Sequence, residues 1–216
     1  MRQGVLNLPV EPQFEPADFL VSDSNRAAFD LIERWPDWPA RAVIIEGPVG
    51  SGKTHLAHLW CRRSGAMLVP VDTAALADPA ALPVIVAVDD AERADERALL
   101  HLYNLTLERG GSLLLTLPAP SAALTIGLAD LASRLRSLPV ASIASPDDRL
   151  LASVLVKHFA DRQLRVAPAV FAYLLPRIER SFAAAAAVAA RLDQLALERR
   201  QKVTIKLARE ALAEFG

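Results

Sequence analysis

The chain has 216 residues, 52% of them hydrophobic, which suffices for one α/β core and a small appendage. Its formal net charge of −1 argues against the global basic field of many nucleic-acid-binding proteins, although a local basic patch at 199–202 stays open. The one cysteine excludes an internal disulfide, and no apolar run approaches the length of a membrane span, so we expect a soluble cytoplasmic protein with no membrane partner.

The N-terminal part of the chain predicts an extended segment followed by a helix. Residues 1–22 are rich in proline, phenylalanine and acidic residues. Helical spacing runs from Ser24, a plausible cap, to Arg34, and the sequence Trp35-Pro36-Asp37-Trp38-Pro39 ends it. The short β-branched run at 42–45 then predicts a buried strand.

Directly after this strand, residues 47–54 read Gly-Pro-Val-Gly-Ser-Gly-Lys-Thr, which fits the phosphate-binding P-loop. A helical pattern follows, so the glycines can turn backbone N–H groups toward a phosphate at a helix N-terminus. Lys53 is expected to reach the β- and γ-phosphates, and the Thr54 hydroxyl to hold Mg²⁺. The alternative is a glycine-rich turn with a chance lysine. The expected nucleotide-binding positions here are Pro48, Gly50, Ser51, Gly52, Lys53, Thr54 and His55.

A second motif supports ATP or ADP as the ligand. A strand is expected at 67–70, and the apolar run 84–88 ends in Asp89-Asp90, a Walker B pattern. Asp89 is expected to hold Mg²⁺, while Asp90 stands where many ATPases carry a glutamate that orients the attacking water. The shorter aspartate favours weak or no ATPase activity of its own. The alternative is a strand followed by an acidic turn.

The remaining pattern predicts the rest of a parallel α/β sheet and then helices alone. We expect helices at 92–108 and 129–135, strands at 113–116 and 139–143, and helices at 147–162, 168–176, 179–199 and 205–214. Thr204 is a plausible cap, and the alanine run 183–187 favours a closely packed helix. The domains predicted are an N-terminal segment at 1–22, a nucleotide-binding core at 23–145 and a helical lid at 146–216.

With both Walker motifs and a lid, the chain resembles the AAA+ ATPases and, within them, the DnaA-related family that includes the regulatory Hda proteins. The resemblance implies that Phe19, Val21 and Asn25 lie beside the adenine. It makes Thr116 the sensor I residue near the γ-phosphate, and Arg180 a sensor II residue that bridges lid and phosphates. The alternatives are a threonine that ends a strand and an ordinary first-turn arginine.

Residues 130–135, Asp-Leu-Ala-Ser-Arg-Leu, resemble the box that carries the family's arginine finger. This resemblance implies that Arg134 reaches nucleotide bound to a neighbouring subunit, where its planar fork suits the charge of the transition state. The alternative is a surface arginine on a helix.

The resemblance to the Hda proteins rests on further features. No helix-turn-helix domain follows the lid before Gly216, and the short interval between Lys53 and Asp89 leaves little room for the additional helix that DnaA carries there. Residues 3–8, Gln-Gly-Val-Leu-Asn-Leu, resemble the family's sliding-clamp-binding peptide at Gln3, Leu6 and Leu8, whereas Gly4 departs from it.

Three functions therefore compete. The resemblance implies a negative regulator of replication initiation that binds the clamp, contacts DNA only through the clamp, and stimulates hydrolysis of DnaA-bound ATP, acting as a homo-oligomer. The second is a stand-alone ATPase such as a helicase loader, in which Asp89, Asp90 and Thr116 act on the bound ATP. The third is a fragment of a DnaA-like initiator.

Overall fold

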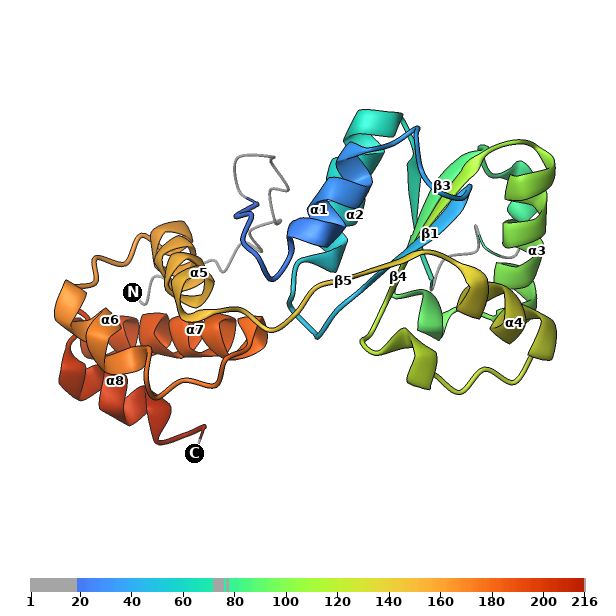
Figure 1. The fold of residues 1–216 in the computed structure, drawn as a ribbon. Coiled ribbons are helices and arrows are strands. Elements are labelled where there is room, and N and C mark those ends of the chain that lie inside the picture. The colour runs from blue at the N-terminus through green and yellow to red at the C-terminus, as the bar shows by residue number, and fades with distance from the viewer. Residues whose placement is uncertain (1–18, 72–75, 77, 216) are drawn as a thin grey trace, which may run out of the picture.

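The computed structural model of the chain describes residues 19–71, 76 and 78–215. Its first part is a five-stranded sheet in which every pairing is parallel, in the order β2-β3-β4-β1-β5 (Figure 1). The strands are β1 (Ala42–Glu46), β2 (Met67–Pro70), β3 (Ile85–Asp89), β4 (Ser112–Leu117) and β5 (Val140–Ser142). The predicted parallel α/β core is thus confirmed.

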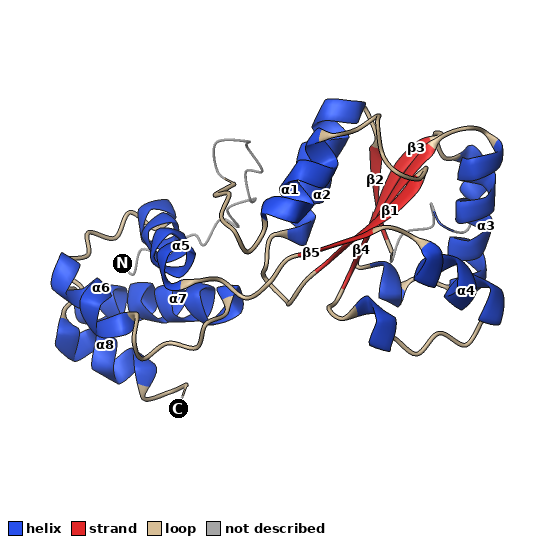
Figure 2. Cartoon of the chain, in the orientation of Figure 1, coloured by secondary structure: helices blue, strands red, loops and turns tan. Residues whose placement is uncertain are grey.

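Two pairs of helices cover the sheet, one pair on each face (Figure 2). On one face α1 (Arg26–Glu33) and α2 (Lys53–Ser64) bury Trp60 and the β1 residues Val43 and Ile45. On the other face lie α3 (Glu96–Glu108) and α4 (Ala129–Ser137). The short 3₁₀ turns of the core are η3 (Pro79–Ala81), η4 (Ala91–Arg93) and η5 (Ser121–Ala123).

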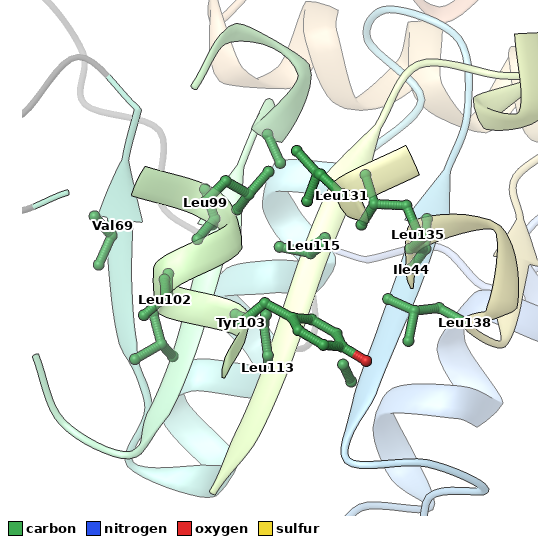
Figure 3. Close-up of a cluster of buried hydrophobic side chains, with 14 of the residues drawn as sticks. Ile44, Val69, Leu99, Leu102, Tyr103, Leu113, Leu115, Leu131, Leu135 and Leu138 are labelled. Atoms are coloured by element: carbon green, nitrogen blue, oxygen red, sulfur yellow. The ribbon is translucent and has the colours of Figure 1, made fainter. Parts of the chain in front are cut away.

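The second face is packed by leucines of α3 and α4 around Tyr103 (Figure 3). Leu131 and Leu135 of α4 meet Leu113 and Leu115 of β4 in this cluster, and all four side chains are nearly inaccessible to solvent. Their spacing of four residues on α4 and of two on β4 is what a helix and a strand need to present one apolar face. This packing fixes α4 on the sheet.

Four helices form a separate bundle after β5, with a hydrophobic core of its own (Figure 1). They are α5 (Asp148–Asp161), α6 (Pro168–Leu174), α7 (Phe182–Arg199) and α8 (Ile205–Leu212). The alanine run lies in α7, where Ala185 and Ala189 are fully buried, so small side chains let the neighbouring helices approach closely. The predicted helical lid is confirmed.

Three predicted helix starts are wrong, each for a local reason. Helix α1 begins at Arg26 after Asn25, because the Ser24 hydroxyl bonds Ser22 instead of capping the helix. Helix α3 begins at Glu96, after η4, with the Asp95 carboxylate accepting from the N–H of Ala98 at 2.9 Å.

Helix α7 is the third case. It begins at Phe182 because the Ser181 hydroxyl caps it, accepting from the N–H of Ala184 at 3.0 Å. The predicted cap Thr204 does precede α8, where its hydroxyl accepts from the N–H of Leu207.

Candidate nucleotide-binding site

The P-loop joins the carboxyl end of β1 to the amino end of α2, the position that its chemistry requires. Gly50 and Gly52 adopt φ values of +74° and +95°, in the left-handed region that favours glycine. Gly52 is also the N-cap residue of α2 and has no side chain to satisfy the first N–H groups of that helix. The loop therefore offers backbone donors at a positive helix end.

Lys53 is buried, with 8% of its surface exposed. Its Nζ donates to the carbonyl oxygens of Gly47 at 2.9 Å and Pro48 at 3.0 Å. Among the described residues, no carboxylate forms an ion pair with Lys53. Because a buried ammonium is costly without an anion, the residue fits an anionic ligand in the loop.

Ser51 points to the same conclusion. Its Oγ is fully enclosed and has no hydrogen-bond partner within the described chain. An orphaned polar atom inside the loop, together with an unpaired lysine, fits a phosphate group better than it fits a structural turn.

Asp89 is the centre of a compact cluster of oxygen atoms. The Thr54 hydroxyl donates to its Oδ2 at 2.7 Å, and the Thr116 hydroxyl donates to its Oδ1 at 2.6 Å. The cluster forms because β3 pairs with β4 up to Val88 and Leu115, so the next residue of each strand lies at the same edge of the sheet. The predicted metal ligands Thr54 and Asp89 are thus side by side, and their hard oxygens fit Mg²⁺.

Asp90 differs from its neighbour. Its backbone has a φ of +51°, its N–H donates to Thr116 Oγ1 at 2.9 Å, and its carboxylate lies 3.9 Å from the guanidinium of Arg93. The left-handed conformation turns the chain into η4 directly after the strand. Thr116 itself is completely buried, and its hydroxyl contacts both aspartates of the motif.

The N-terminal segment reaches the P-loop through Phe19. The Phe19 ring stacks on Phe29 with 5.9 Å between centroids and meets the His55 ring edge-on at 5.3 Å. A side chain at Gly52 would meet the Phe19 ring, since an added Cβ lies 3.1 Å from it. Phe19, Gly52 and His55 therefore share one corner of the site.

Asn25 and Val21 lie in the same segment but are placed differently. Asn25 is buried, its Oδ1 accepts from the Ser22 N–H at 2.8 Å, and its Nδ2 donates to the Leu20 carbonyl at 2.8 Å. Its polar atoms thus shape the segment itself. Val21 is exposed, and its contact with adenine stays a prediction.

The lid approaches the P-loop through its backbone. A Cβ added at Gly50 would lie 3.2 Å from the N atom of Ala183 and 3.3 Å from the Cβ of Phe182, in the first turn of α7. Arg180 stands before this helix, which begins at Phe182, so the alternative of an ordinary first-turn arginine is wrong, and its sensor II role stays a prediction. Its Nη2 contacts the Asp148 carboxylate of α5 at 3.0 Å, within the lid.

Arg134 lies on the exposed side of α4. Its Nε donates to Asp130 Oδ1 at 3.0 Å and its Nη2 to Oδ2 at 3.4 Å, while the guanidinium stands 5.4 Å from the centroid of the Tyr103 ring. Among the described residues none of its side-chain contacts is with the P-loop. Its side chain is 37% exposed, and the Asp130 carboxylate occupies two of its donor nitrogens.

Two further residues near the phosphates were not predicted. His58 follows Thr54 by four positions, so both lie on one face of α2; burial lowers the pKa of its imidazole, and the charge of Asp89 acts in the opposite direction. Burial raises the pKa of Glu92 in η4, and the negative charge of Asp90 raises it further, whereas Lys53 lowers it. The helical spacing could have indicated His58, whereas Glu92 depends on the η4 turn.

The predicted clamp-binding residues Gln3, Leu6 and Leu8 lie outside the described residues. Within the described part of the chain, no helix is both long and apolar enough to span a bilayer.

Comparison with known proteins identifies the helical part directly. Residues 147–212 match the family model described as the lid domain of Hda. The domain III of the Thermotoga maritima replication initiation protein DnaA superposes with a TM-score of 0.78 at 18% identity, covering 96% of this chain and 99% of that one. Residues 147–212 thus match the Hda lid family, and the chain as a whole has the fold of DnaA domain III.

Other structures with this fold are less similar. AMPPCP-bound DnaA from Aquifex aeolicus has a TM-score of 0.68 at 18% identity and covers 88% of this chain and 69% of that one. The Holliday junction branch migration motor RuvB of Thermotoga maritima has a TM-score of 0.64 at 14% identity, covering 88% and 66%. The chain thus shares the AAA+ fold of these proteins from the P-loop through the lid.

Proposed function

We propose that this chain is an Hda-type regulator that binds ADP or ATP with Mg²⁺, binds the sliding clamp, and stimulates hydrolysis of the ATP held by DnaA. The observation that carries the proposal is the match of residues 147–212 to the Hda lid domain. A regulator of this kind works in the cytoplasm, reaches DNA through the clamp and inhibits re-initiation of replication.

In this proposal the nucleotide is bound at the P-loop, and the group that acts on DnaA lies on α4. Backbone N–H groups of the loop and Lys53 bind the phosphates, Phe19 and His55 border the nucleotide, and Thr54 and Asp89 hold the metal ion, which neutralises phosphate charge when bound. In this proposal the nucleotide supports the fold of the site, and Arg180 can exchange Asp148 for a phosphate when the lid closes.

Arg134 is the group that acts on DnaA. Its partly exposed position on α4 supports this role, because an arginine finger must enter the site of a neighbouring subunit, and Arg134 would leave Asp130 to do so. A fixed cation there stabilises negative charge that develops on the phosphate oxygens during transfer. The same surface can pair copies of this chain into a homo-oligomer.

A single-turnover assay of DnaA-ATP hydrolysis, with and without DNA-loaded clamp, tests the proposal. We expect the parent chain to accelerate hydrolysis with the clamp and Arg134→Ala to lose about 10³-fold or more in the stimulated rate, with clamp and nucleotide binding unchanged. Arg136→Ala on the same helix is the matched control. Full stimulation by Arg134→Ala would reject the trans mechanism.

The alternative is a stand-alone ATPase that uses Asp89, Asp90 and Thr116. Basal turnover distinguishes the two functions, since a regulator is nearly inactive without DnaA, whereas a helicase loader or similar ATPase turns over alone. The residue at position 90 favours the regulator, because an aspartate is one methylene shorter than the glutamate that orients the attacking water in many such ATPases.

A further inference from the structure

Thr116 is the residue for which the expected role and the geometry differ most. A sensor at this position has to offer a hydrogen bond to the γ-phosphate or to the attacking water. The Thr116 side chain is completely buried. Its hydroxyl has one proton, and that proton is donated to Asp89 Oδ1 at 2.6 Å.

The acceptor side of the same hydroxyl is also in use. Thr116 Oγ1 accepts from the backbone N–H of Asp90 at 2.9 Å. This bond stabilises the left-handed turn at Asp90, an uncommon conformation for a residue with a Cβ. Thr116 therefore fixes both the carboxylate of Asp89 and the direction in which the chain leaves β3.

The two hydroxyls that hold Asp89 are not equivalent. Thr54 is half-buried and lies in the first turn of α2, beside the P-loop, so its bond to Oδ2 at 2.7 Å can open when a cation arrives. Thr116 approaches Oδ1 from the interior of the sheet, from β4. A metal ion can thus take the Oδ2 side while the Oδ1 bond stays in place.

We propose that Thr116 is a positioning residue for the metal ligand Asp89 and does not sense the γ-phosphate. The inference rests on the nucleotide site proposed above, but it makes no use of DnaA or the clamp. Hydrogen-bonded neighbours of metal ligands typically contribute about 10- to 100-fold to metal affinity. The contribution of Thr116 should therefore depend on Mg²⁺ and should be the same for a diphosphate and a triphosphate.

The test uses the full chain and fluorescently labelled ADP and ATP, titrated with Mg²⁺ and again with EDTA. Thr116→Val keeps the shape of the side chain and removes the hydroxyl, and Thr116→Ser restores it. We expect Thr116→Val to lose about 10-fold or more in Mg²⁺-dependent affinity for both nucleotides, with affinity in EDTA unchanged, and Thr116→Ser to bind like the parent. Unchanged binding in EDTA also shows that the variant is folded.

Three results would overturn the inference. A selective loss of ATP affinity with normal ADP affinity would make Thr116 a γ-phosphate sensor. Equal binding by Thr116→Val and the parent would remove any role for the hydroxyl, while the nucleotide site itself would stand. A parent chain that binds neither nucleotide would reject the site and the inference together. If the valine variant does not fold, Thr116→Ala gives the same comparison without a branched apolar side chain beside Asp89.

Discussion

The carboxylate of Glu96 accepts hydrogen bonds from the backbone N–H groups of Gly127, at 2.9 Å, and Leu128, at 2.6 Å. Leu128 is the N-cap residue of α4 and has no polar side chain to cap that helix. Glu96, in the first turn of α3, binds the two N–H groups directly before the first turn of α4, and its negative charge lies at the positive end of that helix. Together with the Tyr103 ring beneath Arg134 and the shared leucine cluster, this contact joins α4 to α3.

We expect Glu96→Ala to lower the free energy of unfolding by about 1 kcal/mol, the typical net contribution of a hydrogen bond. We also expect slower stimulation of DnaA-bound ATP hydrolysis, because the helix that carries Arg134 loses one of its contacts with α3. Urea unfolding and the single-turnover assay measure the two effects. Glu96→Gln keeps one acceptor oxygen, so its stability and stimulated rate should lie between those of the parent and of Glu96→Ala. Arg97→Ala, at the exposed neighbouring position, is the control. If Arg97→Ala lost as much stimulated rate as Glu96→Ala, the cause would be the change in surface charge and not the loss of the Glu96 hydrogen bonds.

We expect Lys53→Ala to weaken ADP binding by about 10- to 100-fold, the worth of a charge-assisted hydrogen bond to a phosphate. The melting temperature without nucleotide should change little, since Lys53 bonds only two carbonyl oxygens of its own loop. Titration calorimetry and thermal melts with and without ADP make the measurement, with the exposed Lys202→Ala as control. ADP binding as tight as in the parent would contradict the P-loop assignment.

The triple replacement of Gln3, Leu6 and Leu8 by alanine should abolish clamp binding. The residues precede the described core, so the melting temperature and nucleotide affinity should stay at the parent values. A titration against the purified clamp measures the affinity, and Gln13→Ala serves as a control in the same segment. Clamp affinity equal to that of the parent would exclude this segment as the binding peptide.

Burial raises the pKa of the Cys61 thiol to about 11 from 9.0. At pH 8 the folded chain should react with iodoacetamide about 100-fold more slowly than the urea-unfolded chain, because only the thiolate attacks. The stability that the neutral thiol contributes is complete below pH 9.0 and decreases as the pH rises toward about 11, since the unfolded chain releases its proton first. Similar alkylation rates in the two states would show an accessible thiolate.

Much of the architecture could be predicted because the strands are continuous apolar runs and the P-loop has a specific pattern. Parallel pairing then brings the carboxyl ends of β3 and β4 together, which is why Asp89 and Thr116 could be placed in one site. The helix starts at Arg26, Glu96 and Phe182 were less predictable, because each depends on which of several neighbouring polar residues caps the helix.

The finer roles of site residues depend on contacts between distant parts of the chain. The bonds of Glu96 to Gly127 and Leu128 span more than 30 positions, and no periodicity encodes them. The contact of Asn25 with adenine stays a prediction, whereas its bonds to Leu20 and Ser22 belong to a local turn that composition does not specify. The role of such a site residue therefore depends on the hydrogen-bond partners of its side chain as well as on its position in a motif.

Gly50 lies so near the first turn of α7 that a side chain at this position would contact Phe182 and Ala183. Steric packing of this kind acts only at short range and does not depend on charge, so it is insensitive to salt. The ion pair of Arg180 with Asp148 is exposed, so dissolved ions screen it. We therefore expect the position of the lid against the P-loop to be the same at low and at physiological salt concentration.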